Sequence, residues 1–251
     1  QEKPQDPKRS LAHPDKVNAS MGVYIFNTQL LIPILLADAE NPDSTHDFGR
    51  DILPSLVKSK RRVIGFPFTG YWMDVGTILS YWQAHMDMLS PNPPLKLYDR
   101  RWIIHTRTEE RPPVRIPQNA SIFASLISDG CYILENARIE NSVLSPGVIV
   151  HPGAVVRESI IMTDTIIESG AVIERAIIDK RVRVEQNARI GGGIANPDIQ
   201  LAVVGKNSII PPGMIIEPGA TIGRDVVASD YPGGVVKTGD LLETKRQPYE
   251  I

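Results

Sequence analysis

The sequence predicts a chain in two parts, an α/β segment over residues 1–90 and a parallel β-helix with a C-terminal tail over residues 119–251. Between Ser125 and Arg224 the chain repeats with a period of seventeen residues, and each repeat carries aliphatic residues at fixed positions. Before the repeat, strand-length apolar runs alternate with segments that have the apolar spacing of helices. A proline-rich linker over residues 91–118 marks the boundary between the two domains.

The repeat contains three aliphatic columns. Its rows are Ser125–Asn141, Ser142–Glu158, Ser159–Arg175, Ala176–Gly192 and, after an interruption, Ser208–Arg224. The columns are Leu126, Val143, Ile160, Ile177 and Ile209; Ile133, Val150, Ile167, Val184 and Ile216; and Ile139, Val156, Ile173, Ile190 and Ile222. Each row buries its aliphatic side chains only by stacking on the next row, as in a solenoid. Glycine, asparagine and Pro-Gly pairs supply the turns between three short faces.

This pattern predicts a left-handed parallel β-helix of about five coils. The spacing resembles that of hexapeptide-repeat proteins, with one residue fewer per coil. Short strands rich in Val and Ile suit parallel ladders about 4.8 Å apart, whereas an amphipathic helix would need an apolar period of about 3.6. We expect Gly193–Lys206 to project as a loop, and the β-helix to end at about Arg224. The polar tail, Asp225–Ile251, would follow with at most a short strand.

Residues 1–90 are expected to form a strand, two helices, a second strand and a third helix. These elements are, in order, Ser20–Asn27, Thr28–Ala37, a helix capped by Asp47, Arg62–Phe68, and Thr77 to about Leu89 with Thr77 as its N-cap. They are too few to cover both faces of a sheet. We therefore expect the C-terminal end of a larger α/β domain of the nucleotide-binding type.

Composition excludes several classes of protein. The 251 residues have a formal net charge of −2, so the sequence has no electrostatic signature of nucleic-acid binding. No run of about eighteen apolar residues predicts a membrane helix, and Gln1–Pro4 does not begin a signal peptide. The one cysteine, Cys131, fits core packing in a reducing cytoplasm rather than a disulfide framework.

Six segments, in order, resemble the ADP-glucose pyrophosphorylases, also called glucose-1-phosphate adenylyltransferases. They are Glu2–Pro4, Ala19–Phe26, His46–Pro54, Tyr71–Thr77, Leu97–Asp99, and the β-helix with its Ile177–Lys180 stretch. The resemblance covers essentially the whole chain, and the order of the segments makes it specific. It implies the C-terminal portion of a Rossmann-like nucleotidyltransferase domain followed by the β-helix. The family's Gly-rich ATP loop has no counterpart here, so we expect a truncated enzyme that is inactive alone.

The resemblance also implies an activity. The family makes ADP-glucose from ATP and glucose 1-phosphate and releases pyrophosphate, for glycogen or starch synthesis in the cytoplasm. It implies Mg²⁺ as cofactor, a homotetramer, and a phosphorylated metabolite as allosteric effector, with no nucleic-acid or membrane partner. Two alternatives remain: a non-catalytic oligomerisation and regulatory fragment, or an enzyme for another sugar 1-phosphate, including a bifunctional acetyl- and uridylyltransferase. His46–Pro54 and Tyr71–Thr77 favour the adenylyl enzyme.

Asp74 is the first candidate for a catalytic and metal-binding residue. Transfers at phosphorus depend on positioning and on neutralised phosphate charge, usually with Mg²⁺ held by carboxylates. By resemblance, Asp74 is one such ligand at the sugar-phosphate end of the site. The alternative is that Asp74 caps the following helix, although Thr77 is better placed to do so.

Three further residues are candidates for substrate binding by resemblance alone. Lys3 would contact glucose 1-phosphate, Glu2 the sugar hydroxyls, and Ser20 the glucose. An ammonium suits a phosphate as a point charge. From the residues alone, Glu2 and Lys3 are also compatible with a solvated charge pair, and Ser20 with a strand-end cap.

Lys180 and Lys206 are candidates for effector binding. They match, by resemblance, lysines that bind a phosphorylated effector in photosynthetic members of the family. Two or three cations near one coil corner would attract a dianion. The alternative is that both lysines are solvated residues at corners of the β-helix.

Two histidines are not expected to be catalytic. His46 would pack beside an Asp47 helix cap. His151 lies where hexapeptide acyltransferases use a general base, but the adjacent Pro152-Gly153 indicates a plain turn.

Overall fold

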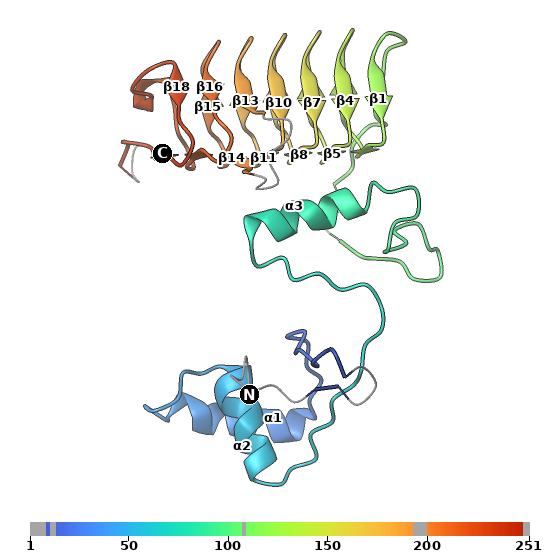
Figure 1. Ribbon diagram of the computed structural model, residues 1–251, viewed down its shortest axis with the longest axis vertical. Coiled ribbons are helices and arrows are strands. Elements are labelled where there is room, and N and C mark those ends of the chain that lie inside the picture. The colour runs from blue at the N-terminus through green and yellow to red at the C-terminus, as the bar shows by residue number, and fades with distance from the viewer. Residues whose placement is uncertain (1–8, 11–13, 107–108, 193–199, 248–251) are drawn as a thin grey trace. The chain divides into compact units, whose positions relative to one another are not determined.

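The computed structural model describes residues 9–10, 14–106, 109–192 and 200–247. They belong to two compact units, Gln1–Trp72 and Met73–Ile251. Figure 1 traces the chain through its helices and through the β-helix. Each unit is described by itself.

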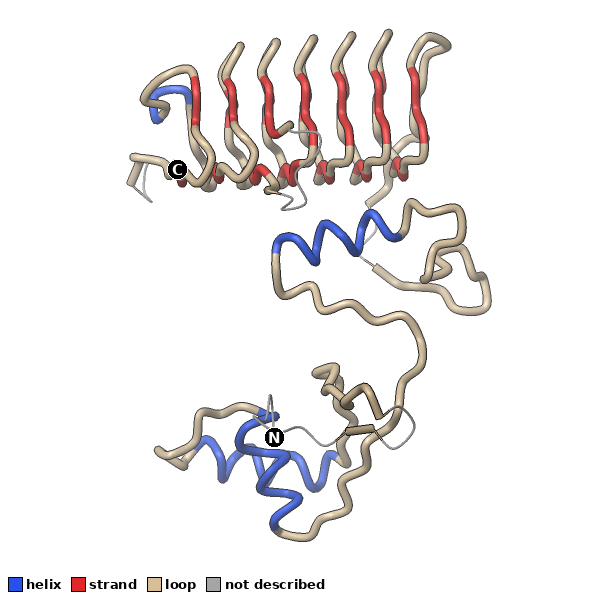
Figure 2. The backbone as a smooth tube through the Cα atoms, viewed as in Figure 1, coloured by secondary structure: helices blue, strands red, loops and turns tan. Residues whose placement is uncertain are grey.

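The helices of the first unit are drawn in blue in Figure 2. Helix α1 is Thr28–Ala39, and a π-helical turn, η1, Phe48–Ile52, leads into α2, Leu53–Lys58. The Asp47 carboxylate accepts hydrogen bonds from the N–H groups of Gly49 and Arg50, at 2.7 and 2.8 Å, so the predicted cap is confirmed. Pro54 sits in the first turn of α2, where it displaces no helical hydrogen bond.

The two strands predicted in this unit do not form. Ser20–Asn27 and Arg62–Phe68 contain no residue in a strand. The side chain of Ile25 is 99% exposed and that of Phe66 is 83% exposed. A strand exists only where a second backbone completes its hydrogen-bond ladder, and among the described residues of this unit the sole bridge joins Arg9 to Val17.

The second unit is built on a three-sided parallel β-helix (Figure 1). The first sheet contains β1 Ser121–Phe123, β4 Arg138–Glu140, β7 Val155–Arg157, β10 Val172–Glu174, β13 Arg189–Gly191, β16 Ile215–Ile216 and β18 Val235–Val236. The second contains β2 Leu126–Ile127, β5 Val143–Leu144, β8 Ile160–Ile161, β11 Ala176–Ile178, β14 Ala202–Val204, β17 Thr221–Ile222 and β19 Leu241–Leu242. The third contains β3 Tyr132–Ile133, β6 Ile149–Val150, β9 Ile166–Ile167, β12 Arg183–Val184 and β15 Ile209–Ile210.

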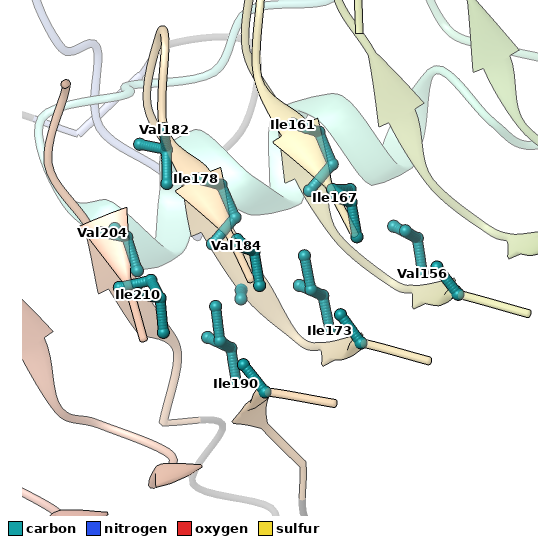
Figure 3. Packing of buried hydrophobic residues seen from close by; sticks show 14 of the residues in the cluster. Val156, Ile161, Ile167, Ile173, Ile178, Val182, Val184, Ile190, Val204 and Ile210 are labelled. Carbon is teal, nitrogen blue, oxygen red and sulfur yellow. The ribbon is translucent and has the colours of Figure 1, made fainter. Parts of the chain in front are cut away.

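Stacked aliphatic side chains fill the interior of the β-helix. Figure 3 shows Val156, Ile173 and Ile190 in one row, each on a successive strand of the first sheet. All three are at most 1% exposed. The second and third predicted columns therefore face the core, as far as Val184 and Ile190.

The first predicted column faces outward instead. Successive residues of a strand point to opposite faces, and the inward positions of β8 and β11 belong to Ile161 and Ile178. Ile160 and Ile177 are nevertheless buried, because helix α3, Ile78–Asp87, packs over them through Trp82.

Helix α3 therefore belongs to the second unit. The sequence placed the domain boundary at residue 90, behind this helix, but the two compact units divide between Trp72 and Met73. The difference follows from the outward aliphatic residues of the second sheet, which offer α3 an apolar surface.

The β-helix extends beyond the predicted five coils in both directions. Two of its sheets have seven strands among the described residues. Strand β1 precedes the first aligned row, and β18 and β19 continue the ladders past Arg224. The tail, for which at most one short strand was predicted, thus contributes two strands to the solenoid.

The interruption shifts the last coils by one face relative to the predicted alignment. Strand β14, Ala202–Val204, lies inside the segment Gly193–Lys206 that was expected to project as a loop, so that prediction is wrong for these residues, and residues 193–199 lie outside the described ranges. Strand β14 pairs with β11, so that Ala202 lies beside Ala176. Strand β14 therefore occupies the position that the predicted repeat alignment assigned to Ile209. As a result Ile210 pairs with Val184, and Ile216 pairs with Ile190 rather than with Val184.

A ladder of serine hydroxyls crosses the corner between the first and second sheets. Ser159 Oγ donates to the carbonyl of Arg157 at 2.6 Å and accepts from the N–H of Ala176 at 3.1 Å. Its own N–H donates to Ser142 Oγ at 3.1 Å. Both serines are fully buried, so each hydroxyl satisfies a corner N–H that water cannot reach.

We predict that Ser159→Ala destabilises the β-helix by about 1–3 kcal/mol, because it leaves the Ala176 N–H and the Arg157 carbonyl without this partner in a buried corner. The measurement is the free energy of unfolding in urea. Ser169→Ala is the matched control, since Ser169 is a partly exposed turn residue. Equal free energies for the two variants would contradict the prediction.

A buried carboxylate closes the C-terminal end of the β-helix. Asp230, in the 3₁₀ turn η2, Ala228–Asp230, accepts hydrogen bonds from the N–H groups of Val227 and Lys245, at 2.9 and 3.1 Å. Burial raises the pKa of this carboxyl, but the two backbone hydrogen bonds, together with a hydrogen bond from Thr244 and the charge of Arg246, hold the pKa below its ordinary value.

We predict that the stability advantage of the wild type over Asp230→Asn depends on pH. A lowered folded-state pKa stabilises the fold fully above the unfolded pKa of about 3.9, and this contribution is lost as the pH falls through the folded value. The difference between the two urea midpoints should therefore shrink from pH 7 to pH 3. A constant difference would show that the carboxylate's charge is not what stabilises this end.

Candidate functional site

Asp74 lies in an exposed turn directly before helix α3. Its Oδ1 accepts a hydrogen bond from the N–H of Gly76 at 3.0 Å. The second oxygen makes no hydrogen bond to any residue that the structure describes. Asp74 thus presents one carboxylate oxygen to solvent while the other holds the turn.

Thr77, not Asp74, caps helix α3, as predicted. Thr77 Oγ1 accepts from the N–H of Ser80 at 3.1 Å, and Ser80 Oγ accepts from the N–H of Thr77 at 3.2 Å. This reciprocal pair is a capping box. It leaves the Asp74 carboxylate available for a ligand.

The one free carboxylate oxygen of Asp74 suits a single contact to a magnesium ion. Over the described ranges there is no cluster of three or more His, Cys, Asp or Glu side chains that could hold a metal. Magnesium keeps several waters and takes one or two carboxylates together with substrate phosphates. An exposed carboxylate with one free oxygen fits that use, and Asp74 would be the residue that holds the ion.

Ser20 lies in the first unit, in a turn with an exposed hydroxyl. Ser20 Oγ accepts from the N–H of Gly22 at 3.2 Å and lies 3.2 Å from the hydroxyl of Tyr24. Gly22 has a φ of +69°, which glycine adopts without strain. Glu2 and Lys3, the other predicted substrate contacts, lie outside the described residues.

Lys180 and Lys206 occupy successive turns of one corner of the β-helix. The N–H of Asn207 donates to the carbonyl of Lys180 at 2.9 Å, and the N–H of Asp225 donates to the carbonyl of Lys206 at 2.9 Å. Arg224 therefore follows at the equivalent place in the next coil. Among the residues that the structure describes, neither lysine side chain has an ion-pair partner.

The sequence reasoning missed Arg224 because the predicted register was displaced by the interruption. A signal was present in the polar ladder beside the cations. Arg181 donates to Asn207 Oδ1 at 2.8 Å, and Asn207 Nδ2 donates to Asp225 Oδ1 at 2.7 Å. Asn and Asp tolerate the left-handed backbone of this corner, where φ is +60° at Asn207 and +59° at Asp225.

The same corner is neutralised at its N-terminal end. Arg111 donates to Asp164 at 2.6 Å and to Glu109 at 2.8 Å, and these carboxylates raise the pKa of its guanidinium. Among the described residues of this corner, the cations without an ion-pair partner therefore include Lys180 and Lys206 of the later coils.

The two histidines occupy structural positions. His46 Nδ1 lies 2.9 Å from Asp38 Oδ2, so it pairs with Asp38 rather than packing beside Asp47. Asp38 also accepts from Ser44 Oγ at 2.6 Å, and both hydrogen bonds lower the pKa of its carboxyl. His151 is half-buried at a turn, where its carbonyl accepts from the N–H of Ala154 at 3.2 Å.

Comparison with known proteins matches both parts of the chain. The model for the nucleotidyl transferase family matches residues 1–91, and that for the GlmU-like C-terminal hexapeptide matches residues 114–198. A glucose-1-phosphate adenylyltransferase of Thermomicrobium roseum is 45% identical over 251 residues, which are 96% of this chain and 56% of that protein. The chain is a homologue of the glucose-1-phosphate adenylyltransferases.

Other adenylyltransferases show the same relation. The enzyme of Pseudothermotoga lettingae is 40% identical over 253 residues, covering 96% of this chain and 57% of that protein. The enzyme of Bacillus subtilis is 44% identical over 135 residues, covering 54% of this chain and 34% of that protein. The chain spans about half the length of the first two of these curated relatives.

The family matches and the structure both divide this adenylyltransferase homologue into two parts, although the nucleotidyl transferase match ends at residue 91 and the compact units divide between Trp72 and Met73. The left-handed winding predicted from the repeat fits the hexapeptide match. That match ends at residue 198, whereas β14 to β19 continue the same ladders beyond it. No helix in the described ranges has the length and apolar character needed to span a membrane.

Proposed function

We propose that the whole protein is a glucose-1-phosphate adenylyltransferase. A phosphate oxygen of glucose 1-phosphate would attack the α-phosphorus of ATP, forming the new P–O bond of ADP-glucose as the bond to pyrophosphate breaks. The observation that supports this most directly is the 45% identity to an enzyme of that name over 251 residues. The proposal includes a cytoplasmic homotetramer that supplies glycogen or starch synthesis.

Asp74 has the central role in this proposal. Its free oxygen would hold Mg²⁺, which neutralises phosphate charge when bound. The hydrogen bond from Gly76 to its other oxygen fixes the carboxylate's direction. Ser20 would donate to a glucose hydroxyl, and Lys3 and Glu2 would contact the phosphate and the sugar.

We predict that Asp74→Asn lowers kcat/KM for glucose 1-phosphate by about 10²-fold or more, because it removes a charge that stabilises the transition state. The full-length protein is assayed for pyrophosphate release with ATP, UTP and dTTP, with and without Mg²⁺. Activity confined to ATP is expected.

Asp43→Asn is the matched control, since Asp43 is also an exposed aspartate in a turn. Equal use of UTP or dTTP would refute the adenylyl assignment. Unchanged kinetics in Asp74→Asn, with ATP-specific activity in the wild type, would refute the role of Asp74 alone.

The proposal extends to regulation at the corner formed by Lys180, Lys206 and Arg224. Three cations on successive turns attract a phosphate dianion, since charge-assisted hydrogen bonds to phosphate are stronger than neutral ones. The stacked backbone hydrogen bonds keep the three residues in adjacent coils. The effector would be a phosphorylated metabolite.

We predict that Lys206→Ala raises the concentration of phosphorylated effector needed for half-maximal response by about tenfold, a change equivalent to about 1.4 kcal/mol of binding free energy. The measurement is the reaction rate as a function of the concentration of added hexose or triose phosphate, relative to the rate without it. Lys237→Ala, at an exposed lysine of the last coil, is the control. An unchanged half-maximal concentration in Lys206→Ala would rule out this corner as the effector site.

A further inference from the structure

We propose that Trp82 is a positioning residue for Asp74, acting through helix α3. The inference rests on the proposed role of Asp74 and concerns how that carboxylate is held in place. In this proposal the β-helix anchors Asp74 through the buried indole of Trp82, which donates a hydrogen bond to a corner of one coil.

The indole of Trp82 is fixed by both packing and a hydrogen bond. Its side chain is 5% exposed and packs against the outward side chains of Ile160 and Ile177, together with Leu201. Its Nε1–H donates to the carbonyl of Glu158 at 2.7 Å. Packing sets the depth of the ring, and the directional hydrogen bond sets its rotation and its position along the sheet.

The acceptor belongs to a rigid corner. Glu158 has a φ of +45° and its neighbour in the next coil, Arg175, has a φ of +52°. Residues other than glycine adopt these positive φ values only where the surrounding structure holds them. Here the Arg175 guanidinium lies 2.9 Å from the Glu158 carboxylate, and the buried hydroxyl of Ser159 follows directly. The indole thus bonds to a corner that moves little.

In the N-terminal turn of α3, Tyr81 packs against the same cluster as Trp82, but the two residues before Ser80 are largely exposed. Ile78 is 53% exposed and Leu79 is 45% exposed, whereas Trp82 is nearly buried. The first turn therefore gains its position from Tyr81 and from Trp82, and of these two Trp82 is the buried one. The capping box at Thr77 continues the rigid backbone to Gly76, whose N–H holds the Asp74 carboxylate. A rotation of α3 about its axis would consequently displace Asp74.

This arrangement predicts a kinetic effect at a distance from the carboxylate. Trp82→Phe keeps an aromatic ring in the cluster but removes the Nε1–H, so the Glu158 carbonyl loses its indole donor. Misplacement of a ligand by about 1 Å from a distant mutation can lower a rate by up to about 10²-fold. We expect Trp82→Phe to raise the Mg²⁺ concentration for half-maximal activity about fivefold, with the rate recovering at saturating Mg²⁺.

The experiment uses the full-length protein and two readouts. The first is Mg²⁺-dependent ADP-glucose formation. The second needs no turnover: binding of Mn²⁺, as a probe for Mg²⁺, and hydrogen exchange of the α3 amides. Trp82→Phe should weaken Mn²⁺ binding about fivefold, in the direction of Asp74→Asn, and should speed α3 exchange about tenfold. Trp102→Phe, at a tryptophan that is 79% exposed, is the control and should change neither.

Two results would overturn the proposal. One is wild-type Mn²⁺ binding and wild-type Mg²⁺ dependence in a folded Trp82→Phe protein. The other is faster α3 exchange without any change in metal affinity, which would make the indole a structural contact only. Absence of ADP-glucose formation by the wild type would refute the proposed reaction, whereas the Mn²⁺ readout would still decide whether Trp82 positions Asp74.

Discussion

The structure of the second unit depends on the stacking of aliphatic columns from one coil onto the next. A single coil contributes strands of two or three residues, too short to form a stable sheet alone, and its inward side chains would be half exposed without neighbours. Buried hydroxyls such as that of Ser159 accept hydrogen bonds from the corner N–H groups that the strand ladders do not pair. Once the coils stack, positions on different coils acquire a fixed register. That register brings Lys180 beside Lys206 and gives α3 an apolar surface.

The repeat predicted this stacking because its period is a local property of the sequence. Four consecutive rows gave the correct register, and the structure pairs Ile133, Val150, Ile167 and Val184 as expected. The prediction failed where a physical choice was not local. After the interruption, the next aliphatic segment could join any of the three sheets. Its place is decided by the pairing of β14 with β11, which the sequence period does not specify. The outward orientation of Ile160 and Ile177 was hidden for a similar reason, since an adjacent isoleucine could equally occupy the core.

The first unit shows the same limit more strongly. Helix periodicity and capping are local, so the sequence predicted a helix over Thr28–Ala37, which the structure extends to Ala39, and it predicted the Asp47 cap. A strand is not local, because its hydrogen bonds need a second backbone, and Ile25 and Ile64 remain exposed on extended segments. The chemistry of Asp74 was likewise inferred from resemblance, since an isolated exposed carboxylate has no spacing pattern that specifies a metal. What local reasoning supplied was the assignment of the helix cap to Thr77, which leaves that carboxylate free.

One strand connects the two proposed sites within the second unit. On β11, Ile177 faces outward against Trp82 and Ile178 faces the core, and the strand runs directly into Asp179 and Lys180. Burial and the negative charge of Asp179 both raise the pKa of Tyr81 on α3, which places this helix within electrostatic range of the corner. If both proposals hold, a ligand that shifts the Lys180 corner would displace the strand on which α3 rests. Binding at the corner and metal affinity at Asp74 would then be linked through one packed element, and such linkage is reciprocal.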